Sequence, residues 1–126
     1  MERRPEMNIL IVDDEIGPRE SLRMILKSNY KVHCVENGHE AIRMVQQAKM
    51  DVVLLDLRMP GISGIDTLKE IKGIDPDIRV IIITAYGTQE SSDDANRYGV
   101  FDYVLKPFNV PEILSRVERA AQESFN

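Results

Sequence analysis

The sequence has little cysteine and no long apolar run, and these two shortages exclude disulfide-stabilised and membrane-spanning classes of protein. A single cysteine, Cys34, cannot form an internal disulfide, so a reducing, cytoplasmic compartment is expected. No apolar stretch approaches the roughly 20 residues that cross a membrane, so no membrane contact is expected. Residues 1–6 are charged and lack the apolar core of a signal peptide. We therefore expect a short N-terminal tail at residues 1–6 and a folded domain over residues 7–126.

Two further shortages exclude classes of function. The sequence holds 16 Lys and Arg residues against 21 Asp and Glu residues, and its net charge of −5 argues against a nucleic-acid-binding surface. It also lacks repeats, low-complexity segments and a Gly/Ser-rich linker, so its 126 residues are expected to form one domain. No Gly-x-Gly-x-x-Gly pattern follows the first apolar run, which argues against a flavodoxin-like or dinucleotide-binding module.

The chain does contain a recurring pair of patterns, a short apolar run followed by a helical periodicity. Uninterrupted apolar runs, typical of strands buried on both faces, lie at residues 9–12, 52–55 and 80–83. Weaker strand patterns lie at residues 31–35 and 101–105. Five such strand–helix pairs with short connections predict an α/β fold of the (βα)5 type, a doubly wound five-stranded parallel sheet with helices on both faces.

Local signals predict where several helices begin and end. Ser63 is expected to cap the start of the third helix and Gly73 to end it. Residues 88–98 are expected to form the fourth helix, although only Ala95 and Tyr98 offer clear apolar contacts and five residues are weak helix formers: Ser91, Ser92, Asp93, Asp94 and Asn96. This helix is therefore predicted to be the least stable of the five.

Polar side chains stand at the ends of four predicted strands. They are Asp13 and Asp14, Asp56, Thr84, and Lys106. Each residue alone has a common explanation, such as a helix cap, a strand residue or a solvated charge. Because the C-terminal ends of parallel strands meet at one edge of the sheet, the set predicts a site there, at a topological switch point.

The residue types at this edge indicate phosphoryl transfer. Three carboxylates brought together repel one another unless a cation joins them, and all-oxygen ligands suit Mg²⁺. A carboxylate nucleophile, a metal ion, a lysine and a hydroxyl donor are the groups that such a reaction uses. The expected product is an aspartyl phosphate on Asp56.

Four segments together identify a family resemblance. They are residues 9–15 (ILIVDDE), 53–61 (VLLDLRMPG), 83–87 (ITAYG) and 101–108 (FDYVLKPF). In this order and spacing, the chain from residue 8 to about residue 121 resembles the receiver domain of a two-component response regulator. The resemblance implies a five-stranded sheet in the flavodoxin-like order 2-1-3-4-5.

The resemblance also implies a role for each residue of the acidic group. Asp56 matches the phosphoacceptor. Asp14 and Asp56 would bind Mg²⁺ directly, with the backbone carbonyl of Arg58 as a third protein ligand. Asp13 would act on the metal through a bound water.

Three residues on the later strands have implied roles as well. Lys106 would contact the phosphoryl oxygens, and the Lys106–Pro107 bond would be cis. Thr84 would turn its hydroxyl toward the phosphoryl group. Tyr103 matches the switch aromatic, although a half-buried core ring is the simpler interpretation of that residue.

The implied function is a signalling switch that is phosphorylated by a sensor histidine kinase or a histidine phosphotransfer protein. The segments at residues 57–61 and 84–88 are most similar to the enhancer-binding, nitrogen-regulation class, in which the receiver precedes an ATPase domain and a DNA-binding domain that regulate transcription. They are also similar to single-domain receivers of sporulation-type phosphorelays, so both alternatives stay open. A homodimer through the fourth or the last helix is compatible with either.

An enzyme with the same nucleophile is the remaining alternative. Haloacid-dehalogenase-like phosphohydrolases also attack with an Asp at a strand end, but they need a second Asp two positions later as a general acid. Here that position holds Arg58, which cannot donate a proton at neutral pH. We therefore expect a signalling domain that catalyses only its own phosphorylation and dephosphorylation.

Overall fold

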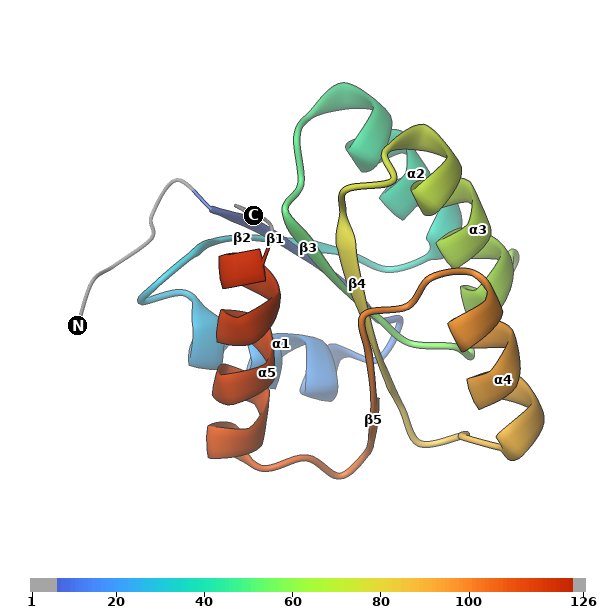
Figure 1. Ribbon diagram of the computed structural model, residues 1–126. Helices are drawn as coiled ribbons and strands as arrows, with labels where there is room; N and C mark the ends of the chain where they lie inside the picture. Colours follow the sequence, from blue (N-terminus) through green and yellow to red (C-terminus); the bar gives the residue numbers. More distant parts are fainter. Residues whose placement is uncertain (1–6, 124–126) are drawn as a thin grey trace.

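The protein forms a doubly wound α/β domain in which strands and helices alternate (Figure 1). This computed structural model describes residues 7–123, so the predicted tail at residues 1–6 lies outside the described residues. The elements are β1 (Asn8–Val12), α1 (Ile16–Leu26), β2 (Lys31–Val35), α2 (Gly38–Gln47), β3 (Val52–Leu55), α3 (Gly64–Ile74), β4 (Arg79–Thr84), α4 (Gln89–Arg97), β5 (Asp102–Leu105) and α5 (Val110–Glu123).

The five strands form one parallel sheet in the order β2-β1-β3-β4-β5, which confirms the predicted topology. Helices α1 and α5 cover one face, and α2, α3 and α4 cover the other (Figure 1). The most apolar early strands, β1 and β3, are neighbours at the centre of the sheet, as expected. The order of connections reverses at β1, so the C-terminal ends of β1 and β3 lie at the switch point.

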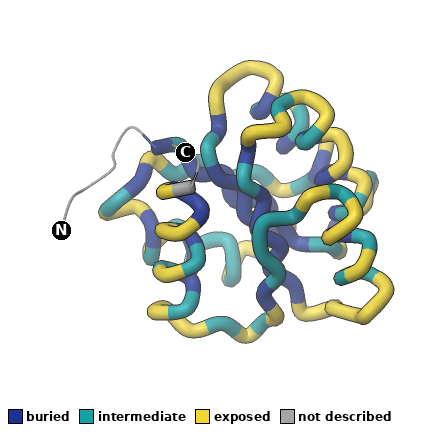
Figure 2. The backbone as a smooth tube through the Cα atoms, viewed as in Figure 1, coloured by how far each residue is buried: buried dark blue, intermediate teal, exposed yellow. Residues whose placement is uncertain are grey.

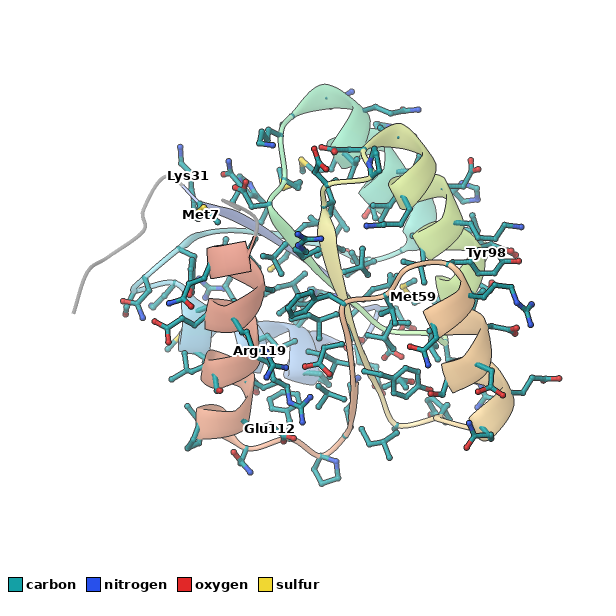
Figure 3. The ribbon with its side chains drawn as sticks, viewed as in Figure 1. Met7, Lys31, Met59, Tyr98, Glu112 and Arg119 are labelled. Carbon is teal, nitrogen blue, oxygen red and sulfur yellow. The ribbon has the colours of Figure 1, made fainter. Side chains whose placement is uncertain are left out.

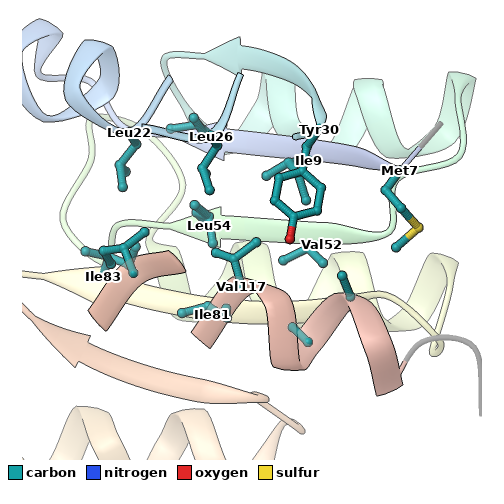
Figure 4. Close-up of a cluster of buried hydrophobic side chains, with 14 of the residues drawn as sticks. Met7, Ile9, Leu22, Leu26, Tyr30, Val52, Leu54, Ile81, Ile83 and Val117 are labelled. Carbon is teal, nitrogen blue, oxygen red and sulfur yellow. The ribbon is translucent and has the colours of Figure 1, made fainter. Parts of the chain in front are cut away.

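The apolar strands serve two separate cores because alternate residues of a strand point to opposite faces. Ile9 and Ile11 enter the cluster beneath α1 and α5, where Val117 of α5 also lies (Figure 4). Leu10 and Val12 enter the cluster beneath α2, α3 and α4. The buried residues therefore run through the middle of the domain as a continuous band, with exposed segments outside it (Figure 2).

Helix α3 begins as predicted and ends later than predicted. The Ser63 hydroxyl accepts a hydrogen bond from the Asp66 N–H at 3.1 Å, which confirms the N-cap. Gly73 does not end the helix, because α3 continues to Ile74 and Gly73 does not adopt a positive φ. The helix stops at Asp75, which is extended (φ −146°) because it precedes Pro76. The expectation at Gly73 was wrong because the proline three residues later ends the helix.

Helix α4 forms where the sequence predicted it and is weakly anchored. Ala95 is its only buried residue, and Tyr98 packs at its C-terminal end from a half-buried position. Gly99 closes it with a φ of +83°, a conformation that glycine adopts without strain. Among the helices at residues 7–123, none has the length and apolar content that crossing a membrane requires.

Candidate functional site

The predicted polar residues converge at the C-terminal edge of the sheet. Asp13 follows β1, Asp56 follows β3, Thr84 ends β4 and Lys106 follows β5. Asp13, Asp56 and Thr84 are all buried, with exposed fractions of 2%, 3% and 0%. Buried carboxylates need partners, so their contacts define the site.

Lys106 lies between the two buried carboxylates. Its Nζ donates to Asp13 Oδ2 at 2.8 Å and to Asp56 Oδ2 at 2.9 Å. Burial alone lowers the pKa of the Lys106 ammonium, but the hydrogen bonds and negative charges of Asp13 and Asp56 outweigh it and raise the pKa above its usual value. Lys106 is therefore the cation that offsets the repulsion between the two carboxylates.

The other oxygen of each carboxylate is held by the backbone of the following loop. Asp13 Oδ1 accepts from the Glu15 N–H at 2.9 Å, and Asp56 Oδ1 accepts from the Arg58 N–H at 3.2 Å. Each carboxylate thus has one oxygen on Lys106 and one on a local N–H group. This arrangement fixes both carboxylate planes before any ligand arrives.

The structure adds Glu15 to the acidic group. Carboxylate oxygens of Asp13, Glu15 and Asp56 lie within 4.8 Å of one another, and Glu15 lies 3.9 Å from the Lys106 ammonium. Sequence reasoning did not single out Glu15, although the run of three acidic residues after β1 was the available signal. Oxygen donors at this spacing fit a hard divalent cation such as Mg²⁺.

Asp14 lies outside this cluster. It is exposed and lines an adjoining pocket of about 320 Å³, together with Glu15, Arg58, Met59, Pro60 and Tyr86. Met59 is buried, and its position between the sheet and the helices is visible in Figure 3. The role of Asp14 as a direct metal ligand therefore stays a prediction.

A cation–aromatic contact stands at the edge of this pocket. The guanidinium carbon of Arg58 lies 4.2 Å from the centroid of the Tyr86 ring. Arg58 follows β3 and Tyr86 follows β4, so the contact joins two loops of the site. Sequence reasoning named Arg58 for its backbone carbonyl and for standing where a phosphohydrolase has its general acid, and it did not predict this contact.

Thr84 and Tyr103 take part in separate hydrogen bonds near the site. The Thr84 hydroxyl accepts from the Tyr86 N–H at 3.1 Å. The Tyr103 ring is half-buried, and its hydroxyl lies 2.7 Å from the Ser91 hydroxyl on α4. The Lys106–Pro107 peptide bond is cis. The structure thus brings Asp13, Asp56 and Lys106 into direct contact. Thr84 instead contacts the loop that precedes α4, and Tyr103 contacts α4 itself.

Sequence comparisons agree with this geometry. The family model described as "Response regulator receiver domain" matches residues 9–118. The chain is 42% identical over 115 residues to Regulatory protein AtoC of Escherichia coli K12, covering 90% of this chain and 25% of that protein. It is 40% identical over 112 residues to Sporulation initiation phosphotransferase F of Bacillus subtilis 168, covering 88% of this chain and 90% of that protein.

Solved structures show the same fold. A CheY-like receiver domain protein from Methanospirillum hungatei JF-1 superposes with a TM-score of 0.91 at 25% identity, covering 94% of this chain and 95% of that one. NtrX from Brucella abortus superposes with a TM-score of 0.86 at 29% identity, covering 93% of this chain and 27% of that one. The chain therefore spans about a quarter of the length of some relatives and nearly the whole length of others.

Proposed function

Because the chain belongs to the response regulator receiver domain family, a family of phosphorylation switches, we propose that Asp56 is its phosphoacceptor. The observation that carries this assignment is the buried Asp56 carboxylate, held between Lys106 and the Arg58 N–H at the edge of the sheet. The domain is a signalling module rather than a catalytic enzyme, and family membership excludes the phosphohydrolase and dinucleotide-binding alternatives.

The reaction that suits this site is transfer from a phosphohistidine. A carboxylate oxygen of Asp56 forms a bond to phosphorus. The phosphorus–nitrogen bond of the donor breaks with its electron pair, and the released imidazole takes a proton from water. The Lys106 ammonium then exchanges its contact with the Asp56 carboxylate oxygen for a contact with a phosphoryl oxygen, because the negative charge now lies there.

A divalent cation completes the proposed site. Mg²⁺ would neutralise charge on the phosphoryl oxygens, held by Asp14, Asp56 and the backbone carbonyl of Arg58, with Asp13 acting through a water. The oxygens of Asp13, Asp56 and Glu15 support the presence of such an ion at this edge. Its assignment to particular ligands is our proposal.

Two residues carry the proposed response. The Thr84 hydroxyl would turn to a phosphoryl oxygen and thereby release the Tyr86 N–H that it now accepts from. Tyr103 would then change its position against α4, where its hydroxyl contacts Ser91. The surface formed by α4 and β5 is accordingly the proposed output surface.

An apolar surface beside Lys106 supports docking of a sensor histidine kinase or a histidine phosphotransfer protein. Two large apolar side chains are exposed there, Met24 at 55% and Val110 at 48%, and both line a hollow of about 510 Å³. A neighbouring hollow of about 450 Å³ includes Lys106, and the two hollows share the side chains of Ser21 and Phe108. Contiguous exposed apolar surface is typical of a protein contact.

The output can take two forms. Since some relatives are about four times longer and are named as transcriptional regulatory proteins, we propose a receiver that controls an ATPase domain and a DNA-binding domain. The second candidate is a single-domain phosphorelay intermediate, which the match over 90% of Sporulation initiation phosphotransferase F favours. Either form would act in the cytoplasm, and a homodimer through α4 or α5 is part of the proposal.

Labelling with a small phosphodonor tests the phosphoacceptor. Incubation of the protein with acetyl phosphate and Mg²⁺ should add one acid-stable, base-labile phosphoryl group, detected by intact mass. Asp56→Asn should abolish the addition, whereas Asp93→Asn, at an exposed position on α4, should not. An unmodified parent protein, under conditions that label a known receiver, contradicts the proposal.

A further inference from the structure

The side chain of Arg58 is held at the site by an aromatic ring rather than by a carboxylate. Its guanidinium lies over the Tyr86 ring at 4.2 Å. Asp14 and Glu15 line the same pocket, yet within residues 7–123 no ion pair joins Arg58 to either of them. The Arg58 guanidinium, in a pocket that carboxylates also line, is therefore stacked on Tyr86.

The backbone of Arg58 is also hydrogen-bonded to the proposed phosphoacceptor, Asp56. Its N–H donates to Asp56 Oδ1, and it follows Asp56 by only two residues. Tyr86 in turn donates its N–H to the Thr84 hydroxyl. The Arg58 side chain thus connects the loop that carries the nucleophile to the loop that leads into α4.

The relative strengths of a cation–aromatic contact and a charged hydrogen bond decide which partner the Arg58 guanidinium prefers once Asp56 carries a phosphoryl group. An exposed cation–aromatic contact corresponds to about a two- to fivefold preference in an equilibrium. A hydrogen bond to an ionised partner corresponds to about ten- to 150-fold, and guanidinium pairs well with phosphoryl oxygens. The phosphoryl oxygens should therefore displace the ring as the partner of the guanidinium.

We propose that the Arg58 side chain binds the phosphoryl group on Asp56 and in doing so leaves Tyr86. This inference rests on the proposed phosphorylation of Asp56. The two positions of Arg58, on the ring or on the phosphoryl group, form a two-state element. Release of Tyr86 loosens the loop that ends at Thr88, the residue that caps α4 through reciprocal hydrogen bonds with Ser91.

The first test compares the binding of beryllofluoride, a phosphoryl mimic, in the presence of Mg²⁺. Arg58→Gln should weaken the apparent affinity by about tenfold because it removes the charged partner. Tyr86→Leu should tighten it by about two- to fivefold because it removes the competing ring. Arg43→Gln, an exposed arginine on α2, is the matched control and should leave the affinity unchanged.

The opposite signs of the two variants separate a binding role from a merely structural one. A structural role for the stacked pair would make both variants weaken binding, and that result would overturn the proposal. Equal affinity for the parent and Arg58→Gln would overturn it too.

The second test follows the Tyr86 ring by nuclear magnetic resonance. On saturation with beryllofluoride, the ring resonances of the parent should move to the positions seen in free Arg58→Gln. If the Arg58 amide responds but the ring resonances stay at their free positions, Asp56 is occupied and the Arg58 inference is wrong. If neither responds and no phosphoryl group is added by acetyl phosphate, the phosphoacceptor assignment fails, and this inference fails with it.

Discussion

The Lys106 ammonium lies 2.9 Å from Asp56 Oδ2, on the oxygen opposite the one that the Arg58 N–H holds. The same ammonium lies 2.8 Å from Asp13 Oδ2. One cation therefore offsets two buried carboxylates, and the side chains of all three are at most 11% exposed. In the metal-free, unphosphorylated site, Lys106 is therefore the cation that contacts both carboxylates.

Lys106→Met should destabilise the metal-free protein by about 1–3 kcal/mol. The substitution leaves two neighbouring buried carboxylates without their cation. Millimolar Mg²⁺ should restore part of the loss because it binds the same carboxylates in the folded state only. Urea unfolding with and without Mg²⁺ measures both effects, and Lys49→Met, at an exposed position, is the control. An unchanged midpoint for Lys106→Met would contradict the interpretation.

The contribution of Lys106 should depend on pH in one direction. Its pKa is raised in the folded protein above the usual value of 10.5, so the unfolded chain releases this proton first as the pH rises. The stabilisation is therefore complete below about pH 10 and is lost as the pH climbs through the folded pKa. The difference in unfolding free energy between the parent and Lys106→Met, measured from pH 7 to pH 11, should be flat and then shrink. A difference that grows above pH 10 would have the wrong sign.

Two glycines of α3 should respond oppositely to alanine. A Cβ on Gly64 would lie 2.4 Å from the Leu57 Cα and 2.6 Å from the Asp56 carbonyl oxygen, both backbone atoms, so Gly64→Ala should cost about 1–3 kcal/mol. A Cβ on Gly73, which lies within α3, would meet no atom within 4 Å beyond the backbone of its own helix, so Gly73→Ala should stabilise the protein by about 0.5–1 kcal/mol. Thermal unfolding of both variants measures the pair. Equal shifts would show that the start of α3 does not approach the backbone of Asp56 and Leu57 this closely.

Helix α4 should show the weakest amide-exchange protection of the five helices in the unphosphorylated protein. Ala95 is its only buried residue, whereas α5 buries Ile113, Val117, Ala120 and Ala121. Few buried contacts lower the free energy of local opening. Hydrogen exchange read by mass spectrometry compares the two helices directly. Protection of α4 equal to that of α5 would refute this expectation.

Tyr103→Phe should loosen the start of α4 specifically. The Tyr103 hydroxyl shares a 2.7 Å hydrogen bond with the Ser91 hydroxyl, which also contacts the Thr88 carbonyl at 3.0 Å. Loss of that bond should speed exchange in the first turn of α4 by about two- to tenfold. Tyr98→Phe, at the other end of the helix, is the control. Unchanged exchange in the first turn would show that the bond does not contribute to holding α4.

Local sequence patterns predicted the fold more completely than they predicted the contacts within the site. The runs that became β1 and β3 predicted adjacent central strands, and Ser63 predicted the start of α3, because burial on both faces and helix capping depend on few neighbouring residues. Gly73 shows the limit of such signals. Glycine and proline both lay near the end of α3, and the extended conformation required before Pro76 decided where the helix stopped.

The sequence by itself determined that Asp13, Asp56, Thr84 and Lys106 meet at one edge, because parallel strands align their C-terminal ends whatever the side chains do. Only the tertiary structure decided how these residues are paired. Lys106 and Asp13 are 93 positions apart, and whether Glu15 or Asp14 faces them depends on how the loop after β1 enters α1. The contact of Arg58 with Tyr86 likewise arises between two loops, and distances between loops follow from packing, which no local pattern encodes.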